Sequence, residues 1–277
     1  MSLPAAGLSR ARYGGRARYG IQILHAEWTK LRTVASTGWL LLGAAVVTVA
    51  VSAAADAAAI CPSGGCQADP ARLSLTGVQA GQVIVAAFAV LAISNEYSTS
   101  MIRVTLTAMP RRVTVLAAKA ALVAGLVLAA AAVAVLASVL AGRLILPGHG
   151  FTPAHGYPAL SLVRGPVLRA ACGSVLYLTL IALLSLGVAT AVRESAVAIG
   201  LILGLLYVFP VVTSVIANQH WQRHLEQIGP MTAGLDIQAT VNLSGLPLTP
   251  WEGLGVLALW AAGALIIGAL MFRFRDA

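Results

Sequence analysis

Six long apolar stretches dominate the chain, and each is long enough to cross a membrane as a helix. A spanning helix needs about 20 mostly apolar residues, because each residue adds only about 1.5 Å of length. The six stretches cover residues 38–59, 76–94, 113–141, 166–192, 196–217 and 251–272, and they leave residues 1–37 before the first span and residues 273–277 after the last. In lipid the backbone must form its hydrogen bonds internally, so these stretches predict helices. We therefore expect an all-α polytopic membrane protein with six transmembrane helices.

The connections between the stretches are unequal in length. The polar segment 95–112 joins the second and third spans, and the longest connection, 218–250, joins the fifth and sixth. Within that longest connection, residues 218–228 predict a short helix that Gly229 and Pro230 end. The third and fourth spans exceed what a bilayer requires, so we expect them to tilt or to extend beyond it.

The basic residues indicate how the chain is oriented. If the N-terminus is cytoplasmic, 13 of the 18 Lys and Arg residues lie on the cytoplasmic side, as the positive-inside rule requires. An even number of spans then places both ends of the chain in the cytoplasm.

The composition agrees with this assignment and excludes other classes. The chain is 59% hydrophobic and 10% charged, whereas a soluble domain carries about 25% charged residues. Its net charge of +9 is spread along the flanks of the apolar runs, and no basic patch interleaved with aromatic residues is present. We therefore expect no nucleic-acid partner.

The segment before the first span predicts an amphipathic helix on the membrane surface. The apolar residues Ile21, Leu24, Trp28 and Leu31 recur at helical spacing, and Lys30 and Arg32 lie mainly away from that face. Such a helix suits an interface with anionic lipid headgroups. A basic topology signal without a helix is the simpler alternative, and the two interpretations are compatible.

The connection between the second and third spans also predicts a short helix. Tyr97, Met101, Val104 and Ala108 recur at helical spacing, and Pro110 ends the pattern. An apolar face exposed to the cytoplasm must be covered by something. A soluble protein partner and the membrane surface are equally good candidates on this pattern alone.

Polar residues within the spans are candidates for a polar pathway. Asp56 lies about one turn from the outer end of the first span, so we expect its carboxylate to reach water there. Gln79 and Gln82 share a face of the second span, where a bond to a neighbouring helix is the commoner role. Gly200 and Gly204 form a GxxxG motif in the fifth span, which is typical of close helix packing.

The three cysteines predict one disulfide and one inert thiol. Cys61 and Cys66 flank the turn-forming sequence CPSGGC in the outer connection after the first span. The outer side is oxidising, so a local disulfide is favoured over a metal site. We expect Cys172, within the fourth span, to be a buried thiol.

The sequence lacks the common catalytic signatures, so we expect no enzymatic activity in this chain. It contains no GxxxxGK[ST], HExxH or GxSxG motif. The five histidines lie on both sides of the membrane. His220 and His224 have the i, i+4 spacing of a metal-binding pair, but a solvated helix face is the favoured interpretation, and we predict no metal site.

Two segments carry motifs that resemble one family. In LHAEWTKLRTVASTGWLLL, the string EWTKLR precedes the first span. In ISNEYSTSMIRVTLTAMPRRVTVLAAK, an EY-x-(T/S)-x-M-I-R-x-T-L pattern leads to Pro-Arg-Arg and then a lysine. Both resemble ABC-2-type transporter permeases, especially the actinobacterial branch. The looser string IGPMTAGLDI resembles that family's stretch before the last span.

This resemblance implies a fold and a function. It implies the ABC-2 (type V) exporter fold in the plasma (inner) membrane, in which an elbow helix precedes six spans and two such halves pair as a dimer. The elbow-helix residues would be Trp28, Lys30, Leu31 and Arg32. The residues coupled to a separate ATP-binding cassette ATPase subunit would be Glu96, Tyr97, Met101, Arg103 and Thr107. ATP and Mg²⁺ would bind that partner, and this chain would need no cofactor.

Two other function classes stay open. One is a non-transporting membrane scaffold or sensor. The other is an ion-coupled secondary transporter, which would favour buried carboxylates or broken helices near the middle of the membrane. The cargo of an exporter is not identified, because spans rich in Ala, Val, Leu and Gly suit many amphipathic or lipid-like molecules.

Overall fold

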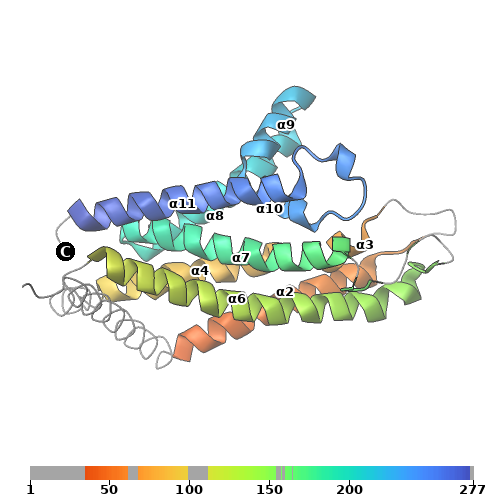
Figure 1. Ribbon diagram of the computed structural model, residues 1–277, viewed down its shortest axis with the longest axis horizontal. Helices are drawn as coiled ribbons and strands as arrows, with labels where there is room; N and C mark the ends of the chain where they lie inside the picture. The colour runs from red at the N-terminus through yellow and green to blue at the C-terminus, as the bar shows by residue number, and fades with distance from the viewer. Residues whose placement is uncertain are drawn as a thin grey trace, which may run out of the picture.

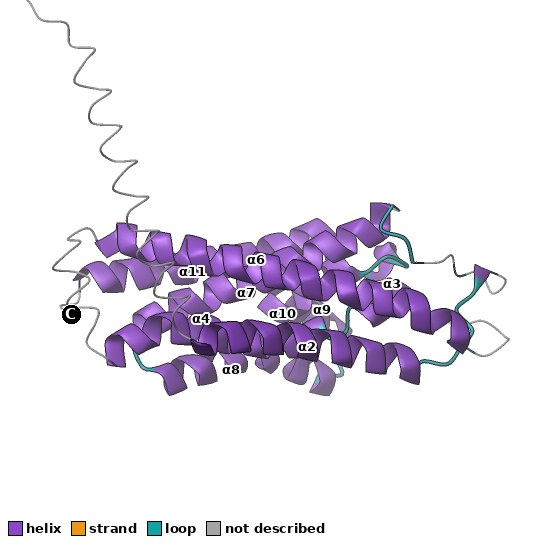
Figure 2. Cartoon of the chain, turned by 90° about the horizontal axis from the view of Figure 1, so that it is seen from below, coloured by secondary structure: helices purple, strands orange, loops and turns teal. Residues whose placement is uncertain are grey.

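The structure is a computed structural model that describes residues 35–61, 68–98, 112–153, 157, 160–163 and 165–274. The predicted elbow-helix residues and most of the segment between the second and third spans lie outside the described residues. Within the described residues the chain forms helices joined by loops, without a strand (Figure 2).

Six of the described helices are long and apolar enough to cross a membrane. They are α2 (Ala35–Ala58), α4 (Val78–Ser98), α6 (Arg112–Ile145), α7 (Gly165–Val192), α8 (Ser195–Val215) and α11 (Pro250–Phe274). The prediction of an all-α polytopic membrane protein with six spans is confirmed. The second helix is longer than predicted and continues to Ser98, because no Gly or Pro interrupts it before that residue.

The axes of the six long helices are roughly aligned, and successive helices run in opposite directions (Figure 1). One end of the bundle contains the start of α2, the start of α6 and the end of α11 (Figure 1). Lys119 lies in the second turn of α6, and we call this end the Lys119 end. The opposite end contains the short helix α3 (Pro70–Ser74), which Asp69 caps, and we call it the Asp69 end.

Helix α7 is the central helix of the bundle. It packs against α4, α6, α8 and α11, and its buried side chains lie along almost its whole length. Small residues make this possible, because Gly, Ala and Ser allow neighbouring helix backbones to approach closely in a membrane.

Helices α7 and α11 approach each other closely at two glycines. A Cβ atom on Gly187 would lie 2.5 Å from the carbonyl carbon of Ala264 and 2.6 Å from the amide nitrogen of Leu265. On the other helix, a Cβ on Gly268 would lie 2.6 Å from the carbonyl oxygen of Gly187. Only glycine fits at these two positions without moving a backbone.

Helix α6 extends past the other spans at the Asp69 end. Its 34 residues give a length of about 51 Å, against a hydrocarbon core of about 30 Å. The 3₁₀ helix η1 (Leu146–His149) follows it. The prediction that the third span is longer than a bilayer needs agrees with this length.

The connection between α8 and α11 is largely helical. It contains α9 (Gln219–Ile228), α10 (Pro230–Leu235), η3 (Asp236–Gln238) and η4 (Leu243–Gly245). The predicted helix 218–228 is confirmed: the Asn218 side chain caps α9 by accepting from the His220 amide at 3.0 Å, and Gly229 ends the helix. Helix α9 stands out sideways from the bundle, whereas α10 packs against α11 and α8 (Figure 1).

The glycine contact between α7 and α11 predicts a specific sensitivity. Gly187→Ala should lower the free energy of unfolding by about 1–3 kcal/mol, because the added methyl group meets backbone atoms that cannot turn away. Thermal unfolding in detergent measures the effect. The control is Gly125→Ala in α6, where a Cβ meets nothing within 4 Å and stability should be unchanged or slightly higher. Equal stability of the two variants would contradict the packing argument.

Candidate functional site

At the Lys119 end, two contacts flank the segment that carries the ABC-2-like motif. Tyr97, in the last turn of α4, packs beneath the guanidinium of Arg193, whose carbon lies 5.4 Å from the ring centroid. Lys119 of α6 is buried, and its Nζ donates to the backbone carbonyl of Ala92 at 3.3 Å. The end of α4 is therefore held by both the α7–α8 turn and the start of α6.

The turn between α7 and α8 has a defined geometry. Arg193 adopts a left-handed backbone with φ of 66°, which is uncommon outside glycine and asparagine. Glu194 then caps α8, and its carboxylate accepts from the amides of Ala196 and Val197 at 3.0 and 2.6 Å. This cap fixes the turn that presents Arg193 to Tyr97.

The structure places only part of the predicted coupling set. Glu96 belongs to the last turn of α4, but its side chain is not described, and Tyr97 lies as stated above. Met101, Arg103 and Thr107 lie outside the described residues. So do all four predicted elbow residues, Trp28, Lys30, Leu31 and Arg32. Their roles stay predictions.

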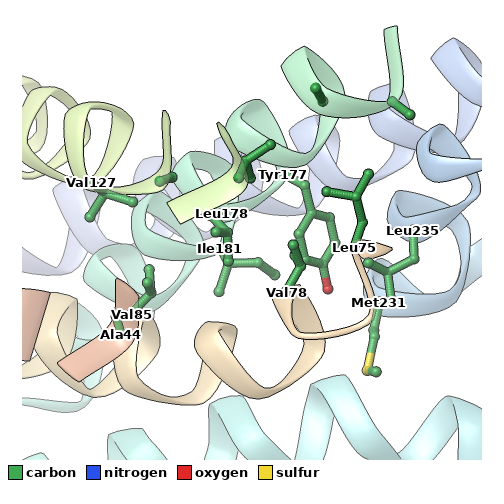
Figure 3. Packing of buried hydrophobic residues seen from close by; sticks show 14 of the residues in the cluster. Ala44, Leu75, Val78, Val85, Val127, Tyr177, Leu178, Ile181, Met231 and Leu235 are labelled. Atoms are coloured by element: carbon green, nitrogen blue, oxygen red, sulfur yellow. The ribbon is translucent and has the colours of Figure 1, made fainter. Parts of the chain in front are cut away.

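A buried polar network connects α4, α7, α8 and α10. The Tyr177 hydroxyl donates to Gln82 Oε1. Gln82 Nε2 in turn donates to the Tyr207 hydroxyl and to Met231 Sδ, each at 3.3 Å. Figure 3 shows the Tyr177 ring with Leu75, Val78 and Met231 around it. Gln82 therefore bonds to neighbouring helices, the commoner of the two roles considered for it.

Gln79 plays a different part from Gln82. Its side chain is exposed, and its backbone carbonyl accepts from the Tyr207 hydroxyl at 3.2 Å. The two glutamines therefore do not form a shared polar pathway among the described residues.

The segment formed by α10 and η3 enters the bundle beside α7. Gln238 Nε2 donates to the Leu75 carbonyl at 3.4 Å and to Ser174 Oγ at 3.1 Å. A Cβ on Gly173 would lie 2.0 Å from the Ile237 side chain, so the glycine makes room for that residue. This segment closes the Asp69 end of the bundle around a buried core.

Asp56 does not reach water, contrary to the sequence-based expectation. It is 0% exposed, and Oδ1 accepts from Ser74 Oγ at 3.0 Å. Helix α6 covers it at Gly142, where a Cβ would lie 2.9 Å from Asp56 Oδ2. Oδ2 has no hydrogen-bond partner in the structure. The prediction was wrong because α3 and the extension of α6 fold over the end of α2.

Asp69 ties together two connections at its end of the bundle. Its Oδ1 accepts from the α3 amides of Ala71 and Arg72 at 3.1 and 3.2 Å, and from Thr240 Oγ1 at 2.6 Å. Its Oδ2 accepts from the amides of Thr240 and Val241 at 2.5 and 3.1 Å. One carboxylate thus caps a helix and holds a segment 171 residues further along the chain.

The cysteines are only partly as predicted. Cys61 is disulfide-bonded, while Cys66, its predicted partner, lies outside the described residues. The Cys61 amide also donates to the His149 carbonyl at 3.0 Å, which joins this loop to η1. Cys172 is exposed rather than buried, because it lies on a face of α7 near its Asp69 end that no other described element covers.

Asp236 is the second buried carboxylate at the Asp69 end. It is 5% exposed, lies outside the six spans, and its Oδ2 has no hydrogen-bond partner in the structure. Burial raises the pKa of Asp236 from 3.8 to about 6, an effect that nearby Arg72 reduces and Glu226 increases. The ionised form is therefore disfavoured in the fold.

The polar groups described above act as helix caps, hydrogen-bond partners and packing contacts. Within the described part of the chain, no three His, Cys, Asp or Glu side chains gather as a metal site. His220 and His224 pack edge to face on α9, with ring centroids 4.5 Å apart, and both are exposed.

No protein-family model matches the chain, and a comparison with curated proteins finds no similar sequence.

Several important residues were missed by sequence reasoning. The helix cap at Asp69 could have been predicted, since Asp before Pro is a typical helix start. No sequence pattern indicates its hydrogen bonds to Thr240 and Val241. Tyr177 and Gln238 carried no signal, because a single polar residue in an apolar stretch does not indicate its partner.

Removing the Asp69 carboxylate should release the connection before α11. In Asp69→Ala, the amides of Thr240 and Val241 should exchange hydrogen about tenfold faster, because both lose their acceptor. Hydrogen–deuterium exchange with mass spectrometry measures this. Thr240→Val removes a single side-chain bond and should give a smaller effect. Unchanged exchange in Asp69→Ala would contradict the assignment.

The raised pKa of Asp236 predicts a pH-dependent stability. The unfolded carboxyl ionises near pH 3.8 and the folded one near pH 6, so the folded state binds the proton more tightly. Its stabilising contribution is full below about pH 4 and is lost as the pH rises through about 6. The free energy of unfolding of Asp236→Asn should lack this pH dependence. Compared with wild type, the variant should therefore become relatively more stable as the pH rises from about 4 to about 6. Unfolding midpoints measured across the range test this, and parallel curves would refute it.

Proposed function

We propose that this chain is the membrane-spanning permease subunit of an ATP-binding cassette exporter. It would form the translocation path and couple to a separate ATPase subunit that binds ATP and Mg²⁺. In this proposal the chain lies in the plasma (inner) membrane, the Lys119 end faces the cytoplasm, and both chain ends lie there.

The observation that carries the proposal is the arrangement around the motif-bearing segment. That segment leaves α4 just after Tyr97, which Arg193 contacts, and returns into α6 two turns before Lys119. A force applied to it would therefore act on α4, α6 and the α7–α8 turn together. This arrangement supports a docking role for the residues predicted to couple, Glu96, Tyr97, Met101, Arg103 and Thr107.

Pairing with a second copy or a homologue belongs to the same proposal. A Cβ on Gly200 or Gly204 of α8 would meet nothing within 4 Å. Val197, Leu201 and Val208 around these glycines are each more than half exposed. An open small-residue face of this kind supports helix pairing between two subunits.

The transport step would be an alternating-access change driven by the partner. ATP binding closes the two cassettes, and the coupling segments move with them. The permease contributes two packing arrangements whose populations the partner shifts. This chain would hydrolyse nothing itself.

One observation favours a second candidate, the ion-coupled secondary transporter. Asp56 is a buried intramembrane carboxylate, and such residues often bind protons or ions in that class. Its position near the end of α2 and its bond to Ser74 on α3 suit a structural role as well. The exporter is therefore the better-supported proposal.

Neutralising the coupling segment tests the proposal. This chain is co-expressed with a candidate cassette ATPase subunit, and the complex is purified and reconstituted into vesicles. Glu96→Gln/Arg103→Gln should reduce co-purification of the ATPase about tenfold, or leave its activity unresponsive to the permease, because the docking charges are lost. Membrane insertion should be unchanged.

The matched control removes one charge of each sign at the other end of the bundle. Arg143 and Glu252 are both exposed near the Asp69 end, and Arg143→Gln/Glu252→Gln should leave coupling intact. Normal coupling in the Glu96/Arg103 variant would refute the docking assignment. Transport that needs an ion gradient and no ATP would favour the second candidate instead.

A further inference from the structure

An apolar groove of about 560 Å³ runs between α8 and α11. Leu184 and Val188 of α7 form its floor, Leu205 of α8 forms one wall, and Leu259 and Gly263 of α11 form the other. The end of α9 closes the groove at Gln227 and Ile228. The volume falls within the range of small-molecule sites, yet no described side chain fills it.

The lining of the groove excludes a polar ligand. Its polar side chains are Gln227 and Trp260, and both already donate hydrogen bonds. Gln227 Nε2 donates to the Pro247 carbonyl at 3.0 Å, and Trp260 Nε1 donates to the Ile228 carbonyl at 3.0 Å. A ligand in the groove would therefore contact hydrocarbon almost exclusively, so its buried part must itself be hydrocarbon.

The groove opens sideways at the level of the spans. Leu259 and Ile267 on its rim are 74% and 52% exposed, and both belong to the spanning helix α11. Side chains exposed at this level face lipid tails. The chemical species that reaches the opening most readily is an acyl chain of the surrounding bilayer.

A basic lip lies at the end of the groove formed by α9. Arg223 lies one turn before Gln227 and on the same face, and His220 and His224 lie beside it. The side chains of Arg223, His220 and His224 are exposed, whereas Glu226, the one acidic residue of α9, is half-buried. This arrangement offers a phosphate group a cationic partner next to the place where an acyl chain would leave the groove.

We propose that this groove binds one acyl chain of an anionic glycerophospholipid, with the phosphate beside Arg223 on α9. The bound chain would fill the space between α8 and α11 that their shared packing on α7 leaves open. This site is independent of the proposed transport function, because it requires neither a cassette partner nor a cargo.

Gly263 offers a way to fill the groove without disturbing the fold. A Cβ on Gly263 meets nothing within 4 Å, so a larger side chain there projects into the empty volume. Gly255, on the same helix, also meets nothing within 4 Å but does not line the groove. The two positions therefore form a matched pair for substitution.

The experiment is native mass spectrometry of the purified chain titrated with dioleoylphosphatidylglycerol. Gly263→Leu should bind this lipid about tenfold more weakly than wild type, a difference of about 1.4 kcal/mol. Gly255→Leu should bind it as wild type does. Gly263→Ala, which suits a helix better than glycine, should give a partial loss and keeps the test informative if the leucine variant does not fold.

The headgroup is tested separately with dioleoylphosphatidylcholine, which carries the same acyl chains without net charge. Wild type should prefer the anionic lipid, and Arg223→Gln should remove that preference while chain binding persists. Equal binding of phosphatidylglycerol by the Gly263 variants and wild type would refute the groove as the site. Equal binding of the two lipids by wild type would refute the anionic headgroup.

Discussion

The contact between α7 and α11 at Gly187 and Gly268 is the constraint on which the rest of the bundle depends. Lipid tails provide no hydrophobic driving force between helices, so association relies on close packing and on hydrogen bonds. At these glycines the two backbones approach to distances that any Cβ would prevent. With α11 fixed on one side of it, α7 carries α4, α6 and α8 on its others, and its polar side chains are held away from lipid.

The hydrogen bonds of α7 follow from this central position. Ser174, Ser185 and Thr190 each donate to the carbonyl four residues earlier in the same helix. These side chains therefore need no acceptor on a neighbouring helix and allow close packing. The Tyr177 hydroxyl lies too far from its own backbone for such a bond, and it reaches Gln82 of α4 instead. On α7 these short polar side chains thus donate within their own helix, and the longer Tyr177 side chain donates to another helix.

The sequence predicts the spans and the helix 218–228 well, because a bilayer fixes both the length and the apolarity of a spanning helix and because Asn218 and Gly229 mark local helix ends. It does not predict what covers a given position. Asp56 was expected to reach water, since hydropathy cannot show that α3 and Gly142 fold over it. The bonds of Asp69 to Thr240 join residues 171 positions apart, which no local pattern encodes. Of the residues predicted to couple, only Tyr97 has a described side chain, so that set still rests on the resemblance of its motif.

The pattern of contacts indicates where the bundle can rearrange. Backbone contacts at Gly187 and Gly268 join α7 to α11, and Gly77, in the turn before α4, lies against the backbone carbonyl of Thr48 in α2. Gly142 of α6 instead faces the side chains of Ser74 and Asp56. Between α7 and α4, by contrast, the polar contacts of the described residues include the side-chain hydrogen bond from Tyr177 to Gln82, in addition to apolar packing. A hydrogen bond of this kind contributes about 0.5–1.5 kcal/mol, a size that binding of a partner can offset. A backbone contact at glycine has no second arrangement to adopt, because the two chains already touch. In the alternating-access change proposed above, α7 and α11 would therefore move as one unit, and α2 would move with the turn before α4.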